Sequence, residues 1–458
     1  MKVRLLFILF ALGVLPVFAQ LDIRYQKYEL PNGLQVILYE DHTVPLVAVN
    51  LWYHVGSARE KPGRTGFAHL FEHMMFQGSE HVGKGEHFRL LEEAGGTLNG
   101  STSTDRTNYW EVVPSNFLEL ALWLEADRMA YLLPAMDQAK LDNQRDVVKN
   151  EKRQNYDNRP YGLAWEKIVS SLYPPDHPYH WLTIGSMEDL TAASLEDVKE
   201  FFRTYYVPNN ASLAIGGDFD PAVAKKLVEK YFSDIPRGKP VGTLKKWTPV
   251  LKEEKDVVME DQVQLPRLYL AWPSTAEFAD DDAALDILAG VLAGGKNSRL
   301  YKSLVYEKQI AQDVYAFQNS GELSGSFLII ATAAPGHSLV ELKQAVEEEL
   351  SGVLKHGVSD RELERSKNQV KASFIYGLQH IGGFGGITDQ LNHYNVYLGN
   401  PGYFNDDLAR YERITAKDVQ KAAEKYLATK GRVVLSVVPK GKTDQGVPSA
   451  VPIHREGS

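Results

Sequence analysis

Three stretches in the first half of the chain have counterparts in the second half, all displaced by about 220 residues. The matching pairs are KLDNQRDVVKNE (140–151) with ELERSKNQVKAS (362–373), SLEDVKEFFRTYY (194–206) with TAKDVQKAAEKYL (415–427), and two alternating apolar stretches that end in Trp52 and Trp272. One such match can arise by chance, but several in nearly the same register indicate a duplicated unit. The chain is therefore expected to fold as two similar domains.

Each half mixes alternating apolar strands, such as 45–55 and 327–333, with long amphipathic helices. The clearest predicted helices are 114–132, 137–158, 337–356 and 359–380. This mixture predicts an α+β fold, with a mostly antiparallel sheet packed with helices in each domain.

The domain boundaries follow from shifts in composition. An N-terminal domain is expected at 20–235 and a homologous C-terminal domain at 266–440. The stretch 236–265 is rich in Pro, Gly and charge, as in an exposed linker. The segment 441–458 is expected to be a flexible tail.

Composition restricts the chemistry that a site in these domains can use. The 458 residues include 50 Lys and Arg against 59 Asp and Glu, and the resulting net charge of −9 argues against a nucleic-acid partner. The chain has no Cys, which excludes disulfides, cysteine zinc sites, iron–sulfur clusters and a thiol nucleophile. Any metal must therefore be held by His, Asp or Glu.

The segment 1–19 has the pattern of a signal peptide. Lys2 and Arg4 precede an apolar run, and Val17-Phe18-Ala19 resembles a cleavage site. The run is too short for a stable transmembrane helix, and no later segment has about 18 consecutive apolar residues. The mature protein is expected to be exported to the periplasm or secreted, without stable membrane insertion; an uncleaved N-terminal anchor is the alternative.

The segment GFAHLFEHMMFQG (66–78) places two histidines four residues apart. On a helix, His69 and His73 project from one face, which suits two ligands of a tetrahedral zinc ion. Glu72 lies beside them, where it is free to take a proton from a water. Most other residues of the segment are apolar, so the helix is predicted to be buried on several sides.

Glu151, on the predicted helix 137–158, is the candidate third ligand. Two His and one Glu with an open fourth position are typical of catalytic zinc, whereas structural zinc sites have four protein ligands. The alternatives are ordinary polar residues, or a binding protein with a purely structural zinc. His81 and His87 are interpreted as surface residues rather than ligands.

The motif HLFEH resembles the inverted zinc motif of the pitrilysin, insulin-degrading enzyme and mitochondrial processing peptidase family, the inverzincin metallopeptidases. Further segments that resemble the family are 97–114, 118–129, 144–151 and 217–221. The resemblance covers 21–440 and is greatest to the shorter, exported bacterial members. It implies that the two domains form half of a clam-shell chamber.

The resemblance implies a zinc-dependent endopeptidase with one Zn²⁺ per chain that acts on peptides or unfolded segments. The residues carried over are His69, His73 and Glu151 as ligands, Glu72 as general base, and Asn99, Gly100 and Ser101 on a strand that pairs with extended substrate by β-augmentation. An ordinary edge strand or turn is the alternative for the last three. Gln144 departs from the pattern, because many members carry an acid at this position.

The second half lacks the motif. The stretch 281–295 contains neither His nor Glu, and Ser373 aligns with Glu151. In the insulin-degrading type of chain, the second half supplies an Arg and a Tyr that bind substrate backbone and stabilise the oxyanion. The aligned residues are Val305 and Gln312, and the nearby Arg299 and Tyr301 are expected to pack against a helix start.

The resemblance therefore implies the catalytic member of a heterodimer, in which a homologous subunit supplies the Arg/Tyr pair; a homodimer is the alternative. A non-catalytic structural or chaperone-like subunit of the same fold is the alternative function. The intact set of His69, Glu72, His73 and Glu151 favours the peptidase.

Overall fold

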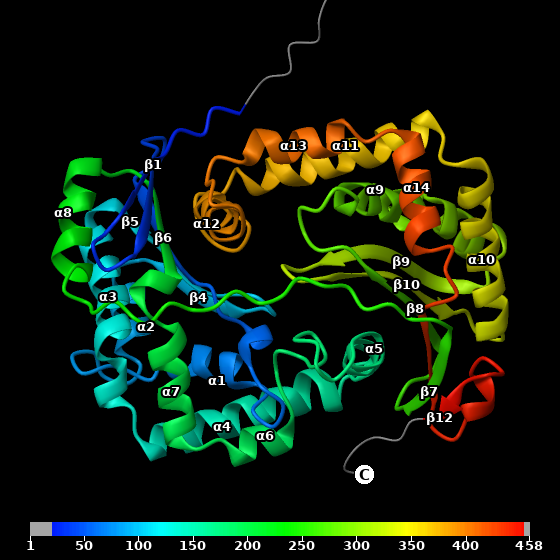
Figure 1. Ribbon diagram of the computed structural model, residues 1–458, viewed down its shortest axis with the longest axis horizontal. Coiled ribbons are helices and arrows are strands. Elements are labelled where there is room, and N and C mark those ends of the chain that lie inside the picture. Colours follow the sequence, from blue (N-terminus) through cyan, green and yellow to red (C-terminus); the bar gives the residue numbers. More distant parts are fainter. Residues whose placement is uncertain (1–20, 453–458) are drawn as a thin grey trace, which may run out of the picture.

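The computed structural model describes residues 21–452, so the predicted signal peptide and the last six residues lie outside the described part of the chain. The described residues form two halves, each built around a six-stranded sheet (Figure 1). The predicted α+β fold with two similar halves is confirmed.

The first sheet has the strand order β1-β2-β6-β3-β5-β4. Its strands are β1 (Gln26–Glu29), β2 (Gln35–Glu40), β3 (Leu46–Tyr53), β4 (Thr97–Thr102), β5 (Thr107–Pro114) and β6 (Ala211–Gly217). Neighbouring strands are antiparallel except for β2 and β6, which are parallel. Strand β4 lies at one edge and is hydrogen-bonded to β5.

The second sheet has the order β12-β7-β11-β8-β10-β9 and repeats the pairing of the first sheet, apart from its outermost strand β12. Its strands are β7 (Lys255–Asp261), β8 (Arg267–Ser274), β9 (Ala311–Ser320), β10 (Gly325–Ala333), β11 (Val433–Pro439) and β12 (Val451–Pro452). Strand β7 is parallel to both β11 and β12. Both sheets are thus mixed, and Trp52 and Trp272 lie on the equivalent strands β3 and β8.

Helices surround both sheets (Figure 1). Those of the first half are α1 (Phe67–Met74), α2 (Glu86–Glu93), α3 (Leu118–Ala135), α4 (Gln138–Lys152), α5 (Ala164–Leu172), α6 (Met187–Ala192), α7 (Leu195–Tyr205) and α8 (Pro221–Phe232). Those of the second half are α9 (Asp282–Ala293), α10 (Leu339–His356), α11 (Asp360–Gly377), α12 (Ile387–Leu398), α13 (Phe404–Glu412) and α14 (Ala416–Tyr426). No described helix has both the length and the apolar character needed to cross a membrane.

Each half lends one helix to the sheet of the other. Helix α5, from the first half, packs on β11 and β8, whereas α12, from the second half, packs on β6, β3 and β2 (Figure 1). In the second contact, Leu391 and Tyr394 of α12 are buried with Ile37 and Ala214 of the first sheet. Burial of these apolar surfaces across the repeat joins the two halves into one interlocked unit.

Two strands lie where the sequence predicts a linker and a tail. Strand β7 occupies 255–261 of the predicted linker, and β12 lies within the part of the predicted tail that is described. The charged run KEEKD leads into β7 because β11 offers a ladder of parallel partners, from Val433 to Pro439. Strand formation here depends on a partner about 180 residues away, which local composition does not reveal.

Candidate metal centre

Helix α1 is held firmly in place by its neighbours. The buried Glu60 carboxylate accepts hydrogen bonds from the backbone N–H groups of Gly66 (2.9 Å) and Ala68 (2.7 Å), which satisfies amides that the first helical turn leaves free. Gly66 has φ of 87°, and a Cβ there would lie 2.7 Å from the Ile184 carbonyl oxygen, so only glycine fits. Five residues of the helix are buried, as the sequence predicts: Phe67, Ala68, Leu70, Phe71 and Met74.

The remaining face of α1 meets α4, and there three metal-binding groups converge. The Glu151 Oε2 atom lies 3.3 Å from His73 Nε2 and 3.7 Å from His69 Nε2. A tetrahedral zinc with ligands at about 2.0–2.1 Å requires ligand atoms about 3.3 Å apart. The three side chains therefore fit the ion that the sequence predicts, and their exposed fractions of 13% to 33% leave the group accessible to solvent.

The electrostatics of this group suit a cation. Burial, and then the neighbouring His73, lower the pKa of His69 to about 4, so its imidazole is neutral and has a free lone pair at neutral pH. The hydrogen bond with His73 lowers the pKa of Glu151 and keeps its carboxylate ionised. Two imidazoles and one carboxylate are a donor set that zinc accepts.

Glu72 lies on the same helix and is oriented by a residue of β4. The Thr102 hydroxyl donates a 2.6 Å hydrogen bond to Glu72 Oε2. Burial raises the pKa of Glu72, while this hydrogen bond acts in the opposite direction. A carboxylate with a raised pKa and one oxygen fixed in place is suited to proton transfer.

The predicted substrate-pairing residues Asn99, Gly100 and Ser101 lie on β4, at the edge of the sheet beside α1. A Cβ at Gly100 would lie 3.1 Å from the Tyr109 ring and 3.3 Å from the Phe76 ring, so glycine lets the strand approach these aromatics closely. An edge strand has backbone groups available to an added strand. The structure thus places the three residues suitably, and their role in substrate binding stays a prediction.

Two residues that orient the site were not selected from the sequence. Thr102 donates a hydrogen bond to Glu72. Asn155 lies in the π-helical turn η3 (Arg153–Asp157), and its amide donates to Glu151 Oε1 over a distance of 3.4 Å. Asn155 could have been predicted to contact Glu151, because the two residues are four apart and so lie one helical turn from each other. Thr102 gave no such signal, because its contact with Glu72 joins a strand to a helix.

Gln144 and His81 were not expected to be metal ligands, and neither belongs to the three-donor group. Gln144 is buried on α4, where its amide donates to Asn143 Oδ1, and it lies outside the three-donor group. His81 is half exposed and hydrogen-bonded to Asp127, as expected of a surface residue.

The interpretation of His87 as a surface residue is wrong, because its side chain is buried beside Glu111 and Glu125. The Arg128 guanidinium donates to both carboxylates, and burial together with this cation lowers the pKa of His87 well below its usual value. We interpret this cluster as a buried ion-pair network. The apolar face of the short helix α2 buries His87 against the sheet.

The second half has no comparable group of His, Asp and Glu among residues 21–452. Val305 is half-buried in the turn η5 (Tyr301–Glu307), and Gln312 is exposed on β9. The Arg299 guanidinium is engaged by the Glu362 carboxylate at the start of α11, at 2.6 and 2.8 Å. This contact agrees with the predicted packing role of Arg299.

Two protein-family models match different parts of the chain. The family model described as insulinase (peptidase family M16) matches residues 35–175, which include the three-donor group. The model described as peptidase M16 inactive domain matches residues 192–370.

Individual relatives extend the similarity over most of the chain. The zinc protease PqqE of Helicobacter pylori is 30% identical over 371 residues, which are 80% of this chain and 82% of that protein. The "Probable mitochondrial-processing peptidase subunit beta" of Arabidopsis thaliana is 25% identical over 425 residues, 90% of this chain and 77% of that protein. The crystal structure of a protease from Helicobacter pylori superposes with a TM-score of 0.84 at 27% identity, covering 91% of this chain and 100% of that one.

Proposed function

The chain belongs to the insulinase family of peptidases, family M16, and from this premise we propose that it is a zinc-dependent endopeptidase that hydrolyses peptides or unfolded polypeptide segments outside the cytoplasm. The observation that carries the proposal is the convergence of His69, His73 and Glu151 beside a Glu72 carboxylate that Thr102 orients. The signal-peptide pattern of 1–19 supports export, to the periplasm or the medium.

The residues of the site have distinct tasks in this reaction. His69, His73 and Glu151 would hold one zinc ion, which when bound supplies Lewis acidity for the scissile carbonyl and lowers the pKa of a water. Glu72 takes the proton of the attacking water and delivers it to the leaving amine. Thr102 keeps the carboxylate aimed during both transfers, and β4 offers backbone groups that hold the substrate extended.

The decisive experiment measures zinc content and hydrolysis in the same preparations. Wild-type protein is expected to hold about one zinc per chain. Glu72→Gln should keep the zinc and lose hydrolysis by about a thousandfold, because the amide cannot accept the proton. Full activity in this variant would contradict the assignment of Glu72. Zinc retention without hydrolysis in any assembly of the wild-type chain would instead favour a structural or chaperone-like subunit.

The partner is a second part of the proposal. At the two positions where the second half of the insulin-degrading type has Arg and Tyr, this chain has Val305 and Gln312. The nearby Arg299 is already paired with Glu362. We propose a heterodimer in which a homologous subunit supplies an Arg/Tyr pair for the oxyanion; a homodimer is the alternative. The Arabidopsis relative is itself named as a subunit.

Titration of the chain with a homologous subunit tests this pairing. The zinc-loaded chain alone should cleave peptides poorly, and a partner that carries Arg and Tyr should restore turnover. A homodimer or monomer with full activity, which a partner does not increase, would contradict the heterodimer.

A further inference from the structure

The backbone groups of β4 that face the free edge of the sheet belong to alternate residues. The Ser103 N–H donates to the Arg106 carbonyl oxygen, so these two residues form a hydrogen-bonded pair at the end of the β4–β5 ladder. Hydrogen-bonded and non-hydrogen-bonded pairs alternate along an antiparallel ladder, so the N–H groups of Leu98, Gly100 and Thr102 point away from β5. These three residues are the ones that can pair with an added strand.

One of these outward N–H groups is covered by the side chain of its neighbour. The Gly100 N–H donates a 2.8 Å hydrogen bond to Oδ1 of Asn99, whose side chain is exposed. Because a C=O bond is about 1.23 Å long, the side-chain carbon of Asn99 lies within about 4 Å of the Gly100 nitrogen. Glycine has no Cβ that would shield this nitrogen. The structure thus brings together the two atoms that become bonded when an Asn-Gly sequence deamidates.

Deamidation needs only these two residues and water. The Gly100 nitrogen attacks the side-chain carbon of Asn99, a C–N bond forms, and a succinimide ring closes. The bond from that carbon to the side-chain nitrogen breaks, and this nitrogen leaves as ammonia with the proton that the backbone nitrogen gives up. Water then opens the ring at either carbonyl. One product has aspartate in place of Asn99, and the other has isoaspartate, whose main chain is longer by a CH₂ group.

The sequence contains Asn-Gly once more, at Asn32 and Gly33, in a setting that opposes the reaction. Asn32 is buried, and its side-chain nitrogen donates to two backbone carbonyl oxygens, at 2.7 and 3.0 Å. The Gly33 N–H donates to the Leu30 carbonyl oxygen at 2.8 Å. Both reacting groups are therefore bonded to other partners, whereas those of Asn99 and Gly100 are bonded to each other.

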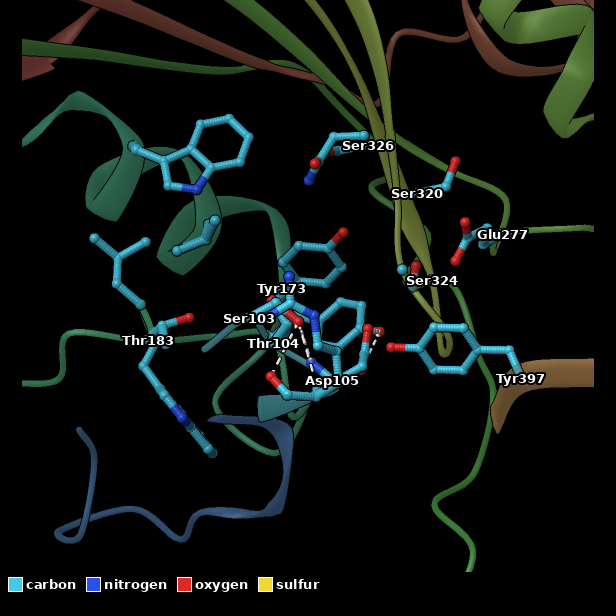
Figure 2. A pocket seen from close by; sticks show the side chains of 18 of the residues that line it. Ser103, Thr104, Asp105, Tyr173, Thr183, Glu277, Ser320, Ser324, Ser326 and Tyr397 are labelled. Atoms are coloured by element: carbon cyan, nitrogen blue, oxygen red, sulfur yellow. Dashed lines mark hydrogen bonds between the residues drawn. The ribbon is translucent and has the colours of Figure 1, made fainter. Parts of the chain in front are cut away.

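The turn that follows β4 is anchored where the two halves meet (Figure 2). Ser103 and Asp105 line a cavity of about 330 Å³ there. Asp105 accepts hydrogen bonds from the Tyr179 hydroxyl, at 2.7 and 2.8 Å, and from the Glu322 N–H at 3.0 Å. A main chain lengthened at the Asn-Gly site therefore cannot slide at this end, so the residues up to Thr102 have to shift out of register.

We propose that Asn99-Gly100 is a site of spontaneous deamidation, and that its isoaspartate product disrupts the free edge of β4. Pairing with β5 sets Thr102 opposite Thr107. A shift of this register moves Thr102 away from Glu72, which it binds through its hydroxyl. The modification itself follows from the geometry of β4, whereas its effect on hydrolysis rests on the proposed peptidase function.

The modification is measured in the full chain without any assay of activity. The protein is incubated at mildly alkaline pH, which favours the deprotonated backbone nitrogen, and its tryptic peptides are analysed by mass spectrometry. Conversion at Asn99 should be at least about tenfold faster than at Asn32, because two hydrogen bonds have to break before Asn32 can react. Equal conversion, faster conversion at Asn32, or no conversion at either residue would overturn the proposal.

Hydrogen exchange tests the structural effect. In converted protein, the amides of β4 should exchange faster than in fresh protein, while those of β9, the equivalent edge strand of the second sheet, should not change. Asn99→Ser has no amide that can leave, so its β4 should keep its initial exchange rate through the same incubation. The matched control is Asn297→Ser, which removes an exposed Asn of the second half and should behave as the wild type. Unchanged exchange in converted protein, or faster exchange in incubated Asn99→Ser, would contradict the disruption of β4.

Peptide hydrolysis is followed in the same samples. Wild-type activity should fall in proportion to the isoaspartate content, and the activity of Asn99→Ser should stay at its own starting level. Full hydrolysis by converted protein would contradict the effect on the site. Conversion and faster exchange in a chain that hydrolyses no peptide in any assembly would contradict the proposed function and keep the deamidation site.

Discussion

Helices α1 and α9 follow equivalent strands of the two sheets, β3 and β8, yet they differ in what they carry. Helix α1 presents His69, Glu72 and His73 toward α4 and β4. Helix α9 is buried along nine of its 12 residues and contains neither His nor Glu. The same scaffold thus carries a candidate metal centre on one of these helices and only buried packing on the other.

The polar groups of the two helices differ in how well they are satisfied. On α1, His69 Nδ1 is buried without a hydrogen-bond partner among the described residues. On α9, Asp282 accepts from the Ser320 hydroxyl, and Asp286 accepts from the Tyr411 hydroxyl at 2.7 Å. An unsatisfied buried polar atom destabilises a fold, so His69 Nδ1 is a destabilising feature of α1, whereas Asp282 and Asp286 of α9 both have hydroxyl donors.

Removing a ligand should give the largest difference between the halves. Glu151→Ala should lower zinc content to near zero and hydrolysis by at least about 100-fold, because even changes around the ligands cost 10–100-fold. Ser373→Ala, at the aligned position of α11, should leave both unchanged. Zinc content is measured after gel filtration, and hydrolysis is measured with a peptide substrate. Loss of zinc in Ser373→Ala would contradict the assignment of all three ligands to the first half.

The next largest effect should come from shortening buried side chains on α5 and α12. Each substitution should loosen the sheet of the half to which the helix does not belong in sequence. Leu391→Ala on α12 and Ile168→Ala on α5 each remove a fully buried side chain and should each destabilise the protein by about 3–4 kcal/mol. Hydrogen exchange should show Leu391→Ala loosening β6 of the first sheet and Ile168→Ala loosening β11 of the second. If faster hydrogen exchange were confined to the half that carries the substitution, the proposed packing of each helix on the sheet of the other half would be contradicted.

The junction between the halves should respond to pH through Asp105. Burial raises the pKa of Asp105 from 3.8 to about 6, so the folded protein binds this proton more tightly than the unfolded chain. Its stabilising contribution is therefore full below about pH 4 and is lost as the pH rises through 6, a change of up to about 3 kcal/mol. Urea unfolding from pH 4 to 7 should show the wild type losing this stability relative to Asp105→Asn. A constant difference between the two would refute the shift.

The smallest effects should be equal in the two halves. Ser194 and Thr415 occupy matching positions of the repeat, and each forms a capping box, with Asp197 at the start of α7 and with Asp418 at the start of α14. Ser194→Ala and Thr415→Ala should each destabilise the protein by about 1 kcal/mol. A clear inequality, measured by urea unfolding, would show that the repeat does not preserve the energetics of its caps.

Features that depend on local spacing were predictable from the sequence. The repeat gave the two α+β halves, and the interval between His69 and His73 placed both imidazoles on one helix face, where the structure brings Glu151 to meet them. The long helices are also close to their predicted bounds, as α10 shows at Leu339–His356.

Features that depend on partners far away in the sequence were not predictable. The Thr102 hydrogen bond to Glu72 joins two elements 30 residues apart, and the Tyr179 hydroxyl, which binds Asp105, accepts from the Leu323 N–H across the two halves. The burial of His87 and the strand β7 have the same cause. Each depends on which surfaces tertiary packing brings together, and residue spacing along the chain does not specify this.

The position of α12 on the first sheet has a consequence for biosynthesis. Strand β6 ends at Gly217 and α12 ends at Leu398, so at 5–20 residues per second a ribosome needs roughly 10 to 40 s to make the segment between them. During this interval Ile37 and Ala214 lack the apolar cover that α12 gives them. A nascent chain stopped before residue 387 would already contain every strand of the first sheet and every candidate metal ligand, so these groups are translated early and the helix that covers their sheet is translated late.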